Sequence, residues 1–433
     1  MPLLNDHART AHTDVTVDPT TTRSSGGRAT LSASVLVTIV LITAIAPLAT
    51  DMYVPAFPLV GRDLAASATQ VQLTLTTFFV GMALGQLAGG PFSDRVGRRQ
   101  PLLAALAILA VTSVVCAFSP SVTVMMVARL VQGFAGGWAM VIARSVVVDL
   151  TNGTQMVRAM NVVAAVAGIV PIVGPLLGAL VLSVTSWRVS FWVVGALATV
   201  MLLAVTLAMP ESLAVDRRHG GGLGRLLGAT GEVLSSRVFS GHLVVFAFSM
   251  GITFAYVATS AYVLQSMNGL TPMQYSVAFA ANAGGMTLAA LIAARYADRV
   301  PARVFVKVGL VATGAAGALL TIAAVWFSMP LEAALVGFFV LMAAQGLVGP
   351  NAGALASAAV PEHPGTGSAL LGFLQWVMAG TIAPLAGLGG EHTAVPMAAI
   401  VLVLTAASAV AYRIAGSRQA RPNSGADAAV STH

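Results

Sequence analysis

Long apolar stretches without charged residues divide this chain at regular intervals. In the first of them, residues 29–50 contain no Asp, Glu, Lys or Arg, and the next charged residue is Asp51. About 20 apolar residues suffice for an α-helix to cross the hydrocarbon core of a bilayer. Only 9% of the 433 residues are charged, against roughly 25% in soluble domains. The mean hydropathy is +0.87. We therefore expect an all-α integral membrane protein.

The apolar stretches, and the Pro- and Gly-rich turns between them, predict twelve spans. The one long hydrophilic break, at residues 210–240, divides them into six and six. The expected spans are 33–57, 69–92, 101–118, 122–146, 158–183, 188–209, 241–266, 273–296, 303–327, 331–358, 366–388 and 394–414. The expected domains are a disordered cytoplasmic tail (1–32), a six-helix half (33–209), a cytoplasmic linker (210–240), a second half (241–414) and a second tail (415–433).

The basic residues favour a topology with both termini in the cytoplasm. In that topology all but three of the 22 Lys and Arg residues lie in or beside cytoplasmic segments, as the positive-inside rule requires. The exceptions are Arg62 and Arg188 outside and Arg129 within the membrane. An odd number of spans would place the C-terminal arginines on the wrong side.

A short motif occurs at the same place in both halves. Ser93-Asp94-Arg95-Val96 follows the second span, and Ala297-Asp298-Arg299-Val300 follows the eighth. Two six-helix halves related by a repeat are typical of transporters that rock around a central site.

Asp51 is an acidic residue inside the first span, with Pro47 and Pro55 on either side. A carboxylate there is costly to bury and usually marks a transport pathway or a proton site. At about 1.5 Å rise per residue, Arg129 in the fourth span lies at a similar depth, and the two charges could offset each other's burial cost. We expect Asp51 and Arg129 to couple transport to protons. The alternatives are that Arg129 extends to the outer interface, and that Asp51 faces lipid or follows the end of the span.

The segment Gly90-Pro91-Phe92-Ser93-Asp94-Arg95-Val96-Gly97-Arg98-Arg99 resembles the loop signature of the major facilitator superfamily. Asp94 and Arg98 are four residues apart and can pair on one helical turn. The resemblance implies a latch that holds the cytoplasmic side shut, in which Asp94 also meets the start of the eleventh span. Anchoring by positive charge alone would need neither Asp94 nor the glycines. The implied latch residues are Gly90, Asp94, Gly97, Arg98 and Asp149.

In the fifth span, residues 168–178 (GIVPIVGPLLG) resemble the antiporter motif of drug exporters in that superfamily. Gly174 and Gly178 form a small-xxx-small face that permits close helix contact, and Pro171 and Pro175 remove backbone donors. Generic glycine packing is the alternative interpretation. The implied motif residues are Gly168, Pro171, Gly174, Pro175 and Gly178.

Further segments narrow the resemblance to the Bcr/CflA branch of drug exporters, over about residues 34–412. This implies a fold of twelve helices in two pseudo-symmetric halves, in a bacterial inner membrane. It also implies proton-coupled export of small amphipathic drugs, such as chloramphenicol- or bicyclomycin-like antibiotics, by alternating access. An exporter of an endogenous metabolite or a sugar fits the same motifs. The segments are residues 46–58, 186–192, 279–282, 349–352 and 365–372.

Polar and aromatic side chains within the spans are candidates for the substrate cavity, although each is more often an interhelical hydrogen bond. We expect Tyr53, Gln132, Asn282, Asn351 and Gln375 to line it; Asn161, Tyr256, Tyr262, Gln345 and Trp376 are further candidates.

Several function classes are disfavoured by what the sequence lacks. It contains no phosphate-binding loop, so ATP does not drive transport directly. An enzyme would need an acid–base pair in the spans, and a receptor would need a large soluble domain or a long tail. We expect no cofactor, no metal and no nucleic acid. The expected form is a functional monomer whose partners are a small-molecule drug, protons and the lipid bilayer.

Overall fold

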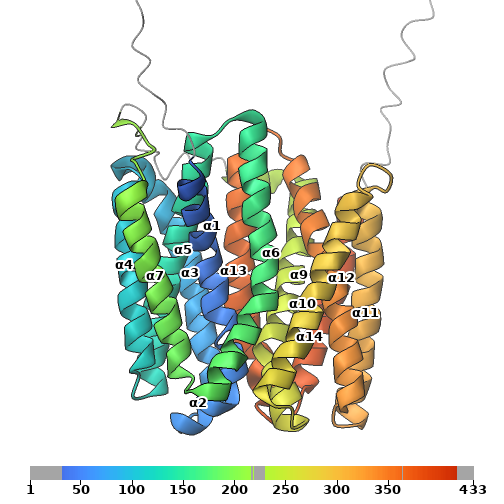
Figure 1. The fold of residues 1–433 in the computed structure, drawn as a ribbon. Coiled ribbons are helices and arrows are strands. Elements are labelled where there is room, and N and C mark those ends of the chain that lie inside the picture. The colour runs from blue at the N-terminus through green and yellow to red at the C-terminus, as the bar shows by residue number, and fades with distance from the viewer. Residues whose placement is uncertain (1–31, 216–217, 219–229, 363, 417–433) are drawn as a thin grey trace, which may run out of the picture.

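The structure, a computed structural model, describes residues 32–215, 218, 230–362 and 364–416. Nearly all of the two predicted tails, 1–32 and 415–433, and much of the predicted linker, 210–240, lie outside the described residues. The described chain begins and ends on one face of a helical bundle, at the top of Figure 1, which we call the tail face. The opposite face is called the far face.

The described residues contain twelve helices long and apolar enough to cross a membrane, which confirms the predicted number. They form the bundle in Figure 1. Their bounds are α1 Ala33–Asp51 with η1 Val54–Ala56 and α2 Phe57–Asp63, α3 Ala68–Val96, α4 Arg99–Ala117, α5 Val122–Leu150, α6 Gly153–Val184, α7 Arg188–Ala208, α9 Arg237–Ala261 with η3 Tyr262–Met267, α10 Pro272–Arg295, α11 Ala302–Trp326, α12 Leu331–Ala358, α13 Pro364–Ala386 with η4 Gly387–Gly389, and α14 Val395–Gly416.

The first span is interrupted where the sequence predicts one continuous helix over 33–57. Helix α1 ends at Asp51, and a short 3-10 turn, η1, follows it. Pro55 explains the interruption, because proline has no N–H to donate to the carbonyl four residues earlier, and its ring clashes with that carbonyl. The carbonyl in question belongs to Asp51. Asp51 is therefore the last residue of a broken membrane helix.

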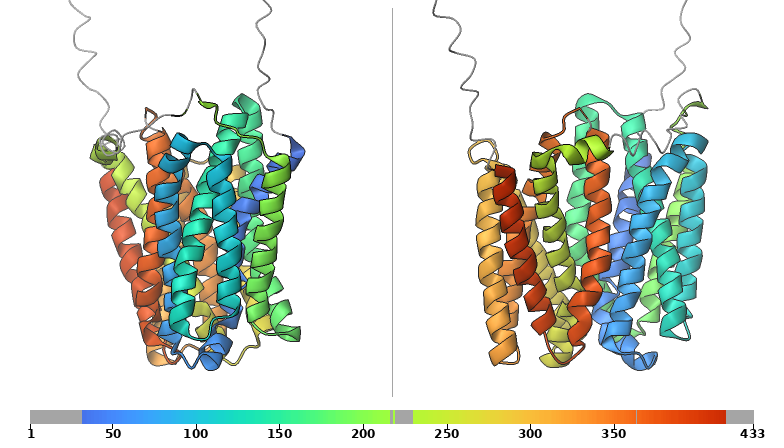
Figure 2. Two further views of the ribbon diagram at one scale, coloured as in Figure 1. Left: turned by 90° about the vertical axis from the view of Figure 1, so that its left-hand side faces the viewer. Right: turned by 180° about the vertical axis from the view of Figure 1, so that it is seen from behind.

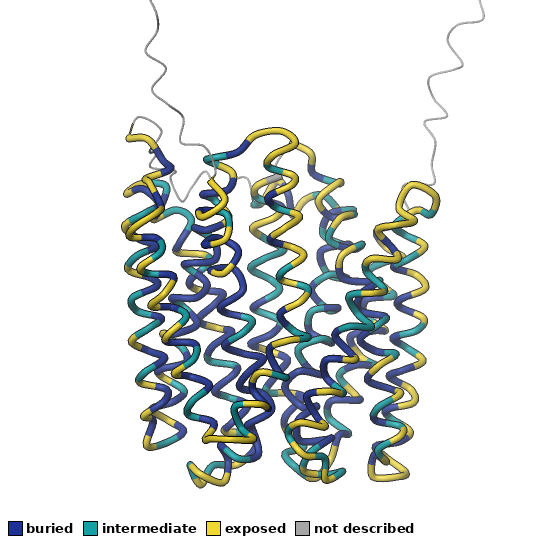
Figure 3. The backbone as a smooth tube through the Cα atoms, in the orientation of Figure 1, coloured by how far each residue is buried: buried dark blue, intermediate teal, exposed yellow. Residues whose placement is uncertain are grey.

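The helices pack as two groups that meet along two seams. Helix α1 contacts α5, α6 and α7, while α9 contacts α12, α13 and α14. The groups meet where α3 contacts α13 and where α6 contacts α10, as the rotated views of Figure 2 help to show. Buried residues run along the centre of the bundle, whereas the part of α6 nearest the tail face is largely exposed (Figure 3).

Local structure repeats between the two groups more closely than the sequence motif indicates. Helices α3 and α10 both begin with a capping box, in which a Ser or Thr side chain and a Gln side chain each bond the other's backbone N–H. The corresponding pairs are Ser67 with Gln70 and Thr271 with Gln274.

A Gln-Gly pair in α5 and another in α12 form a second repeat. Gln132 Nε2 donates to Ser113 Oγ of α4 over 2.7 Å, and Gln345 Nε2 donates to Thr313 Oγ1 of α11 over 2.9 Å. The glycine after each glutamine lies against the backbone of another helix, so a Cβ there would overlap a carbonyl oxygen. Those contacts are Gly133 with Phe78 of α3, and Gly346 with Met286 of α10. This supports the internal repeat in residues far from the loop motif.

Candidate functional site

Asp51 lies at the contact between α1 and α6. The residue is buried, with 7% of its surface exposed. A Cβ on Gly174 would lie 2.7 Å from Asp51 Cβ, and a Cβ on Gly178 would overlap the carbonyl oxygen of Met52. These two glycines belong to the segment that resembles the antiporter motif. They therefore allow the α6 backbone to touch the end of α1 beside the carboxyl group.

Groups from the second half face Asp51 across the seam. Tyr256 of α9 and Tyr275 of α10 both interact electrostatically with its carboxyl group. Asn282 Nδ2 donates to the Tyr256 hydroxyl over 2.9 Å, and the Tyr275 hydroxyl lies 3.1 Å from Ser260 Oγ. The site therefore combines residues of four helices from both groups: α1, α6, α9 and α10.

Arg129 is held in the interior of the first group. None of its surface is exposed. Its Nη1 donates to Gln132 Oε1 over 2.8 Å and to the Ala49 carbonyl over 3.3 Å. Its Cζ lies 4.1 Å from the ring centre of Phe78, 5.1 Å from that of Tyr53 and 5.7 Å from that of Phe191. Aromatic faces attract a guanidinium, yet Nε and Nη2 find no hydrogen-bond partner within the described part of the chain.

Asp51 and Arg129 are not paired in this structure. Among the described residues no ion pair joins them, so the expectation that they offset each other's burial is not met here. Arg129 binds α1 at Ala49, and Asp51, two residues later, points about 200° around the helix axis from Ala49. Asp51 faces α6 and the second half, while Arg129 faces the first half. The alternative that Arg129 extends to the outer interface also disagrees with its complete burial.

The predicted cavity residues fall into separate places. Tyr53 and Gln132 lie beside Arg129, with the Tyr53 hydroxyl 2.9 Å from Thr74 Oγ1, and Asn282 lies near Asp51 through Tyr256. Asn351 Nδ2 bonds the Leu347 carbonyl of its own helix, α12. Gln375 is half-buried on α13.

Tyr275 and Ser260 are site residues that the sequence does not single out. Neither belongs to a motif with recognisable spacing. The interaction of Tyr275 with Asp51 depends on packing between the two groups, and Ser260 takes part through its contact with Tyr275.

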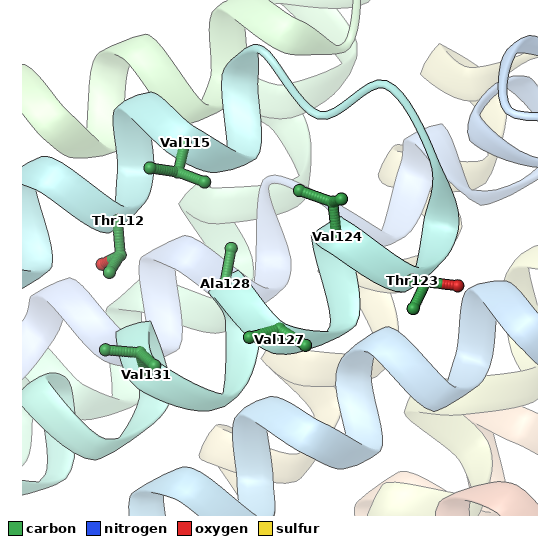
Figure 4. Close-up of a pocket in the computed structure, with 7 residues that line it drawn as sticks. All are labelled: Thr112, Val115, Thr123, Val124, Val127, Ala128 and Val131. Atoms are coloured by element: carbon green, nitrogen blue, oxygen red, sulfur yellow. The ribbon is translucent and has the colours of Figure 1, made fainter.

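A groove on the side of the bundle is unrelated to these residues (Figure 4). It lies between α4 and α5, and the valines in it are among the exposed large apolar side chains. An apolar groove on the outside of a membrane bundle is suited to lipid chains. It is lined by Thr112, Val115, Thr123, Val124, Val127, Ala128 and Val131.

The latch residues form a connected group at the tail face. Arg98 Nη1 pairs with Asp94 at 2.6 Å, and Arg98 Nε pairs with Asp149 at 3.0 Å. Among the described residues, no hydrogen bond or ion pair joins Asp94 to α13. A Cβ on Gly90 would meet nothing within 4 Å. The expected acid–arginine pairs are present, whereas the described residues give no hydrogen bond or ion pair for the expected contact of Asp94 with the eleventh span.

Glu211 and Ser212 extend this group in a way that the sequence does not reveal. The Glu211 carboxylate accepts from the N–H groups of Arg98 (2.8 Å) and Arg99 (3.2 Å), at the start of α4. Ser212 Oγ donates to Asp149 Oδ2 over 3.1 Å. Gly97 has φ +107°, and a Cβ there would also meet Glu211 Oε2 at 2.5 Å. Glycine at position 97 is thus required by both backbone conformation and space.

We expect Asp149→Asn to destabilise the protein more than Asp94→Asn. Asp149 is 14% exposed and Asp94 is 50% exposed, while their shared partner Arg98 is 8% exposed. Leaving the buried Arg98 donor without its partner should cost roughly 1–3 kcal/mol, and removing the exposed partner less than about 1 kcal/mol. Thermal unfolding of the two purified variants in detergent measures the order. A larger fall in melting temperature for Asp94→Asn would contradict this assignment.

Comparison with known proteins places the chain in a family. The family model described as Major Facilitator Superfamily matches residues 39–384. An uncharacterized MFS-type transporter of Bacillus subtilis, YdgK, is 31% identical over 86% of this chain and 92% of its own length. A bicyclomycin resistance protein homolog of Haemophilus influenzae is 26% identical, over 88% and 96%. Multidrug resistance protein D of Escherichia coli is 27% identical, over 82% and 89%.

Solved structures agree on the fold. A bacterial homolog of the human lysosomal transporter Spinster, in an inward-facing and unoccupied conformation, gives a TM-score of 0.71 at 16% identity, over 88% of this chain and 96% of that one. The human organic anion transporter MFSD10 gives 0.63 at 18% identity, over 88% and 99%. Family model, relatives and fold agree: this chain is a multi-pass membrane transporter of the Major Facilitator Superfamily.

Proposed function

We propose that the protein is a proton-coupled antiporter that exports small amphipathic drugs, such as chloramphenicol- or bicyclomycin-like antibiotics. The proposed setting is a bacterial inner membrane, with the tail face in the cytoplasm. The observation that carries the proposal is the position of Asp51. Its carboxyl group is buried at a helix break. It lies against Gly174, in the segment that resembles the antiporter motif, and it interacts with two tyrosines of the other half.

This position suits a group that binds a proton in one state and releases it in another. The four helices around Asp51 come from both helix groups, so rocking of one proposed half (33–209) against the other (241–414) would change its surroundings. Protonation from outside accompanies release of the drug, and deprotonation to the cytoplasm resets the site. A proton that crosses 100 mV supplies about 2.3 kcal/mol, or roughly a 50-fold concentration gradient.

Arg129 has a different proposed role from the one its depth first indicated. Buried beside Gln132 and the Ala49 carbonyl, it fixes the α1 segment that precedes Asp51. Its charge reaches α1 from the side opposite to the carboxyl group. We propose that Arg129 contributes to proton coupling by positioning α1, with Tyr53 and Gln132 packed beside it.

The names of the relatives support drug export as the substrate class. A bicyclomycin resistance homolog and a multidrug resistance protein both match over more than four fifths of their own length.

Drug susceptibility separates this function from its rival. An efflux-deficient bacterial host that expresses the chain should tolerate higher concentrations of at least one amphipathic antibiotic than the host with an empty vector. A protonophore should remove the difference in accumulation of that drug. No change across a broad antibiotic panel would contradict drug export and favour an exporter of an endogenous metabolite or sugar.

A further inference from the structure

Hydrogen bonds between the two helix groups are concentrated at the far face. Four of them join η1 or α3 of the first group to the second group, and in each of them the acceptor is a backbone carbonyl. Side-chain donors therefore supply all four of these bonds at the far face. The bonds run from Thr69 Oγ1 to Gly387 O (3.4 Å), from Gln72 Nε2 to Ala258 O (2.9 Å), from Tyr262 OH to Ala68 O (3.4 Å) and from Gln265 Nε2 to Pro55 O (3.1 Å). We call these residues the far-face gate.

The tail face has no counterpart to this gate in the part of the chain that the structure describes. A further hydrogen bond between the two groups joins Thr287 Oγ1 to the Gly168 carbonyl over 3.4 Å, midway along α10 and α6. A Cβ on Gly90, Gly284 or Gly365 would meet nothing within 4 Å. Among the described residues, the hydrogen bonds between the two groups thus lie at the far face and midway along the bundle.

Gln72 is the most enclosed donor of the gate. It is completely buried. Its Nε2 donates to the Ala258 carbonyl, while its Oε1 has no hydrogen-bond partner among the described residues. That oxygen lies against Gly387, where a Cβ would overlap it, with Gln72 Cδ also too close. A Cβ at position 387 would force this amide group, the far end of a flexible side chain, out of the place from which it bonds the Ala258 carbonyl.

The gate lies where the first helix of each group loses α-helical geometry. Pro55 belongs to the 3-10 turn η1, four residues after Asp51. Tyr262 and Gln265 belong to the π-helical segment η3, at the end of α9. Short π-helical segments are frequent at functional sites and are places where helices bend. Both helices therefore depart from regular α-helical geometry at the gate.

We propose that Gln72 is the positioning residue that closes the far face, and that glycine at position 387 is required to accommodate its amide group. The single bond to Ala258 holds the two groups together, and the unpaired Oε1 makes the closed state easier to leave. A buried acceptor without a partner is unfavourable, and the far face must open in every transport cycle. The proposal concerns the conformational equilibrium and holds whichever substrate is exported.

Distances between spin labels on the full-length protein test the proposal without a substrate. Cys116 is the only cysteine, so Cys116→Ala gives a background free of cysteines. Labels at Arg62→Cys and Met273→Cys, both exposed positions on the far face, report on opening of the gate. In this background Gly387→Ala should raise the ratio of open to closed molecules about tenfold, the effect of losing one buried hydrogen bond.

Two comparisons make the result specific. Gly365→Ala, in the same span but with open space around its Cβ, should leave the distances unchanged. In a Gln72→Ala background, Gly387→Ala should add no further opening, because the group that it displaces is gone. If Gly387→Ala opens the gate equally in both backgrounds, or nowhere, the proposal is wrong.

A second substitution, which keeps the size of the Gln72 side chain, tests the proposal even if Gly387→Ala does not fold. Gln72→Met removes the donor with little change in volume, and should open the gate to the same extent. Unchanged distances in a folded Gln72→Met protein would overturn the role of Gln72.

Discussion

Asp51→Asn should reduce drug export to the level of passive exchange. Asparagine preserves the size of the side chain and its packing against Gly174, but it cannot carry a proton. A transporter uncoupled from protons cannot hold a drug gradient, so the roughly 50-fold ratio available from 100 mV should fall to about one. Accumulation of the identified drug in energised cells measures this change, together with the antibiotic concentration that stops growth.

Asp63→Asn is the matched control for this substitution. Asp63 ends α2, twelve residues after Asp51, and accepts from Arg188 and from Trp187 Nε1, each over 2.9 Å. Its side chain is 49% exposed, and exposed ion pairs contribute at most about 1 kcal/mol. The Asp63→Asn variant should export the drug normally. If energised cells that express the Asp51→Asn variant still accumulate less drug than de-energised cells, Asp51 is not the proton carrier.

Gly178→Ala should damage the protein far more than one methyl group suggests. The added Cβ would overlap the Met52 carbonyl oxygen, and backbone atoms cannot move aside as a side chain can. Helices α1 and α6 would have to separate next to Asp51. Overpacking of this kind costs about 1–3 kcal/mol, and it would also displace the site. We expect a clear fall in thermal stability in detergent and loss of most export.

Gly168→Ala tests whether the effect comes from close packing or from glycine in general. Gly168 belongs to the same helix and the same resembling antiporter segment, but the nearest atom to its added Cβ would be Thr287 Cγ2 at 3.8 Å. That is an ordinary contact, so stability and export should be nearly unchanged. Equal damage from the two substitutions would mean that the Gly178 contact with Met52 is not the cause.

The spans were predictable because charge is nearly absent from them. Uncharged apolar stretches, punctuated by Pro and Gly, predict helix number from short-range information, and the described helices agree. The break after Asp51 was missed because hydropathy does not register the missing N–H of Pro55. The Asp94–Arg98 pair was predicted from a spacing of four residues and is present, although α3 ends at Val96 and Gly97 lies between the two residues. The Arg98–Asp149 pair was implied by the resemblance and is also present.

The composition of the site was less predictable than its location. Rise per residue estimates the depth of Asp51 and Arg129, but depth does not tell which way a side chain points around the helix axis. That rotation separates the two residues here. Tyr275 and Glu211 reach Asp51 and Arg98 through contacts between distant segments, and Ser260 reaches Tyr275 through the packing of two consecutive helices. No periodicity within one segment indicates such contacts.

Proton movement in reconstituted vesicles tests the central claim, that Asp51 carries the exchanged proton. Purified protein is placed in vesicles that contain a pH-sensitive dye, and a gradient of the identified drug is imposed without a pH gradient. The wild-type protein should move protons against the direction of drug movement. Asp51→Asn should let the drug equilibrate without a pH change, while Asp63→Asn behaves as the wild type. Proton movement through Asp51→Asn at the wild-type ratio to drug would contradict the account.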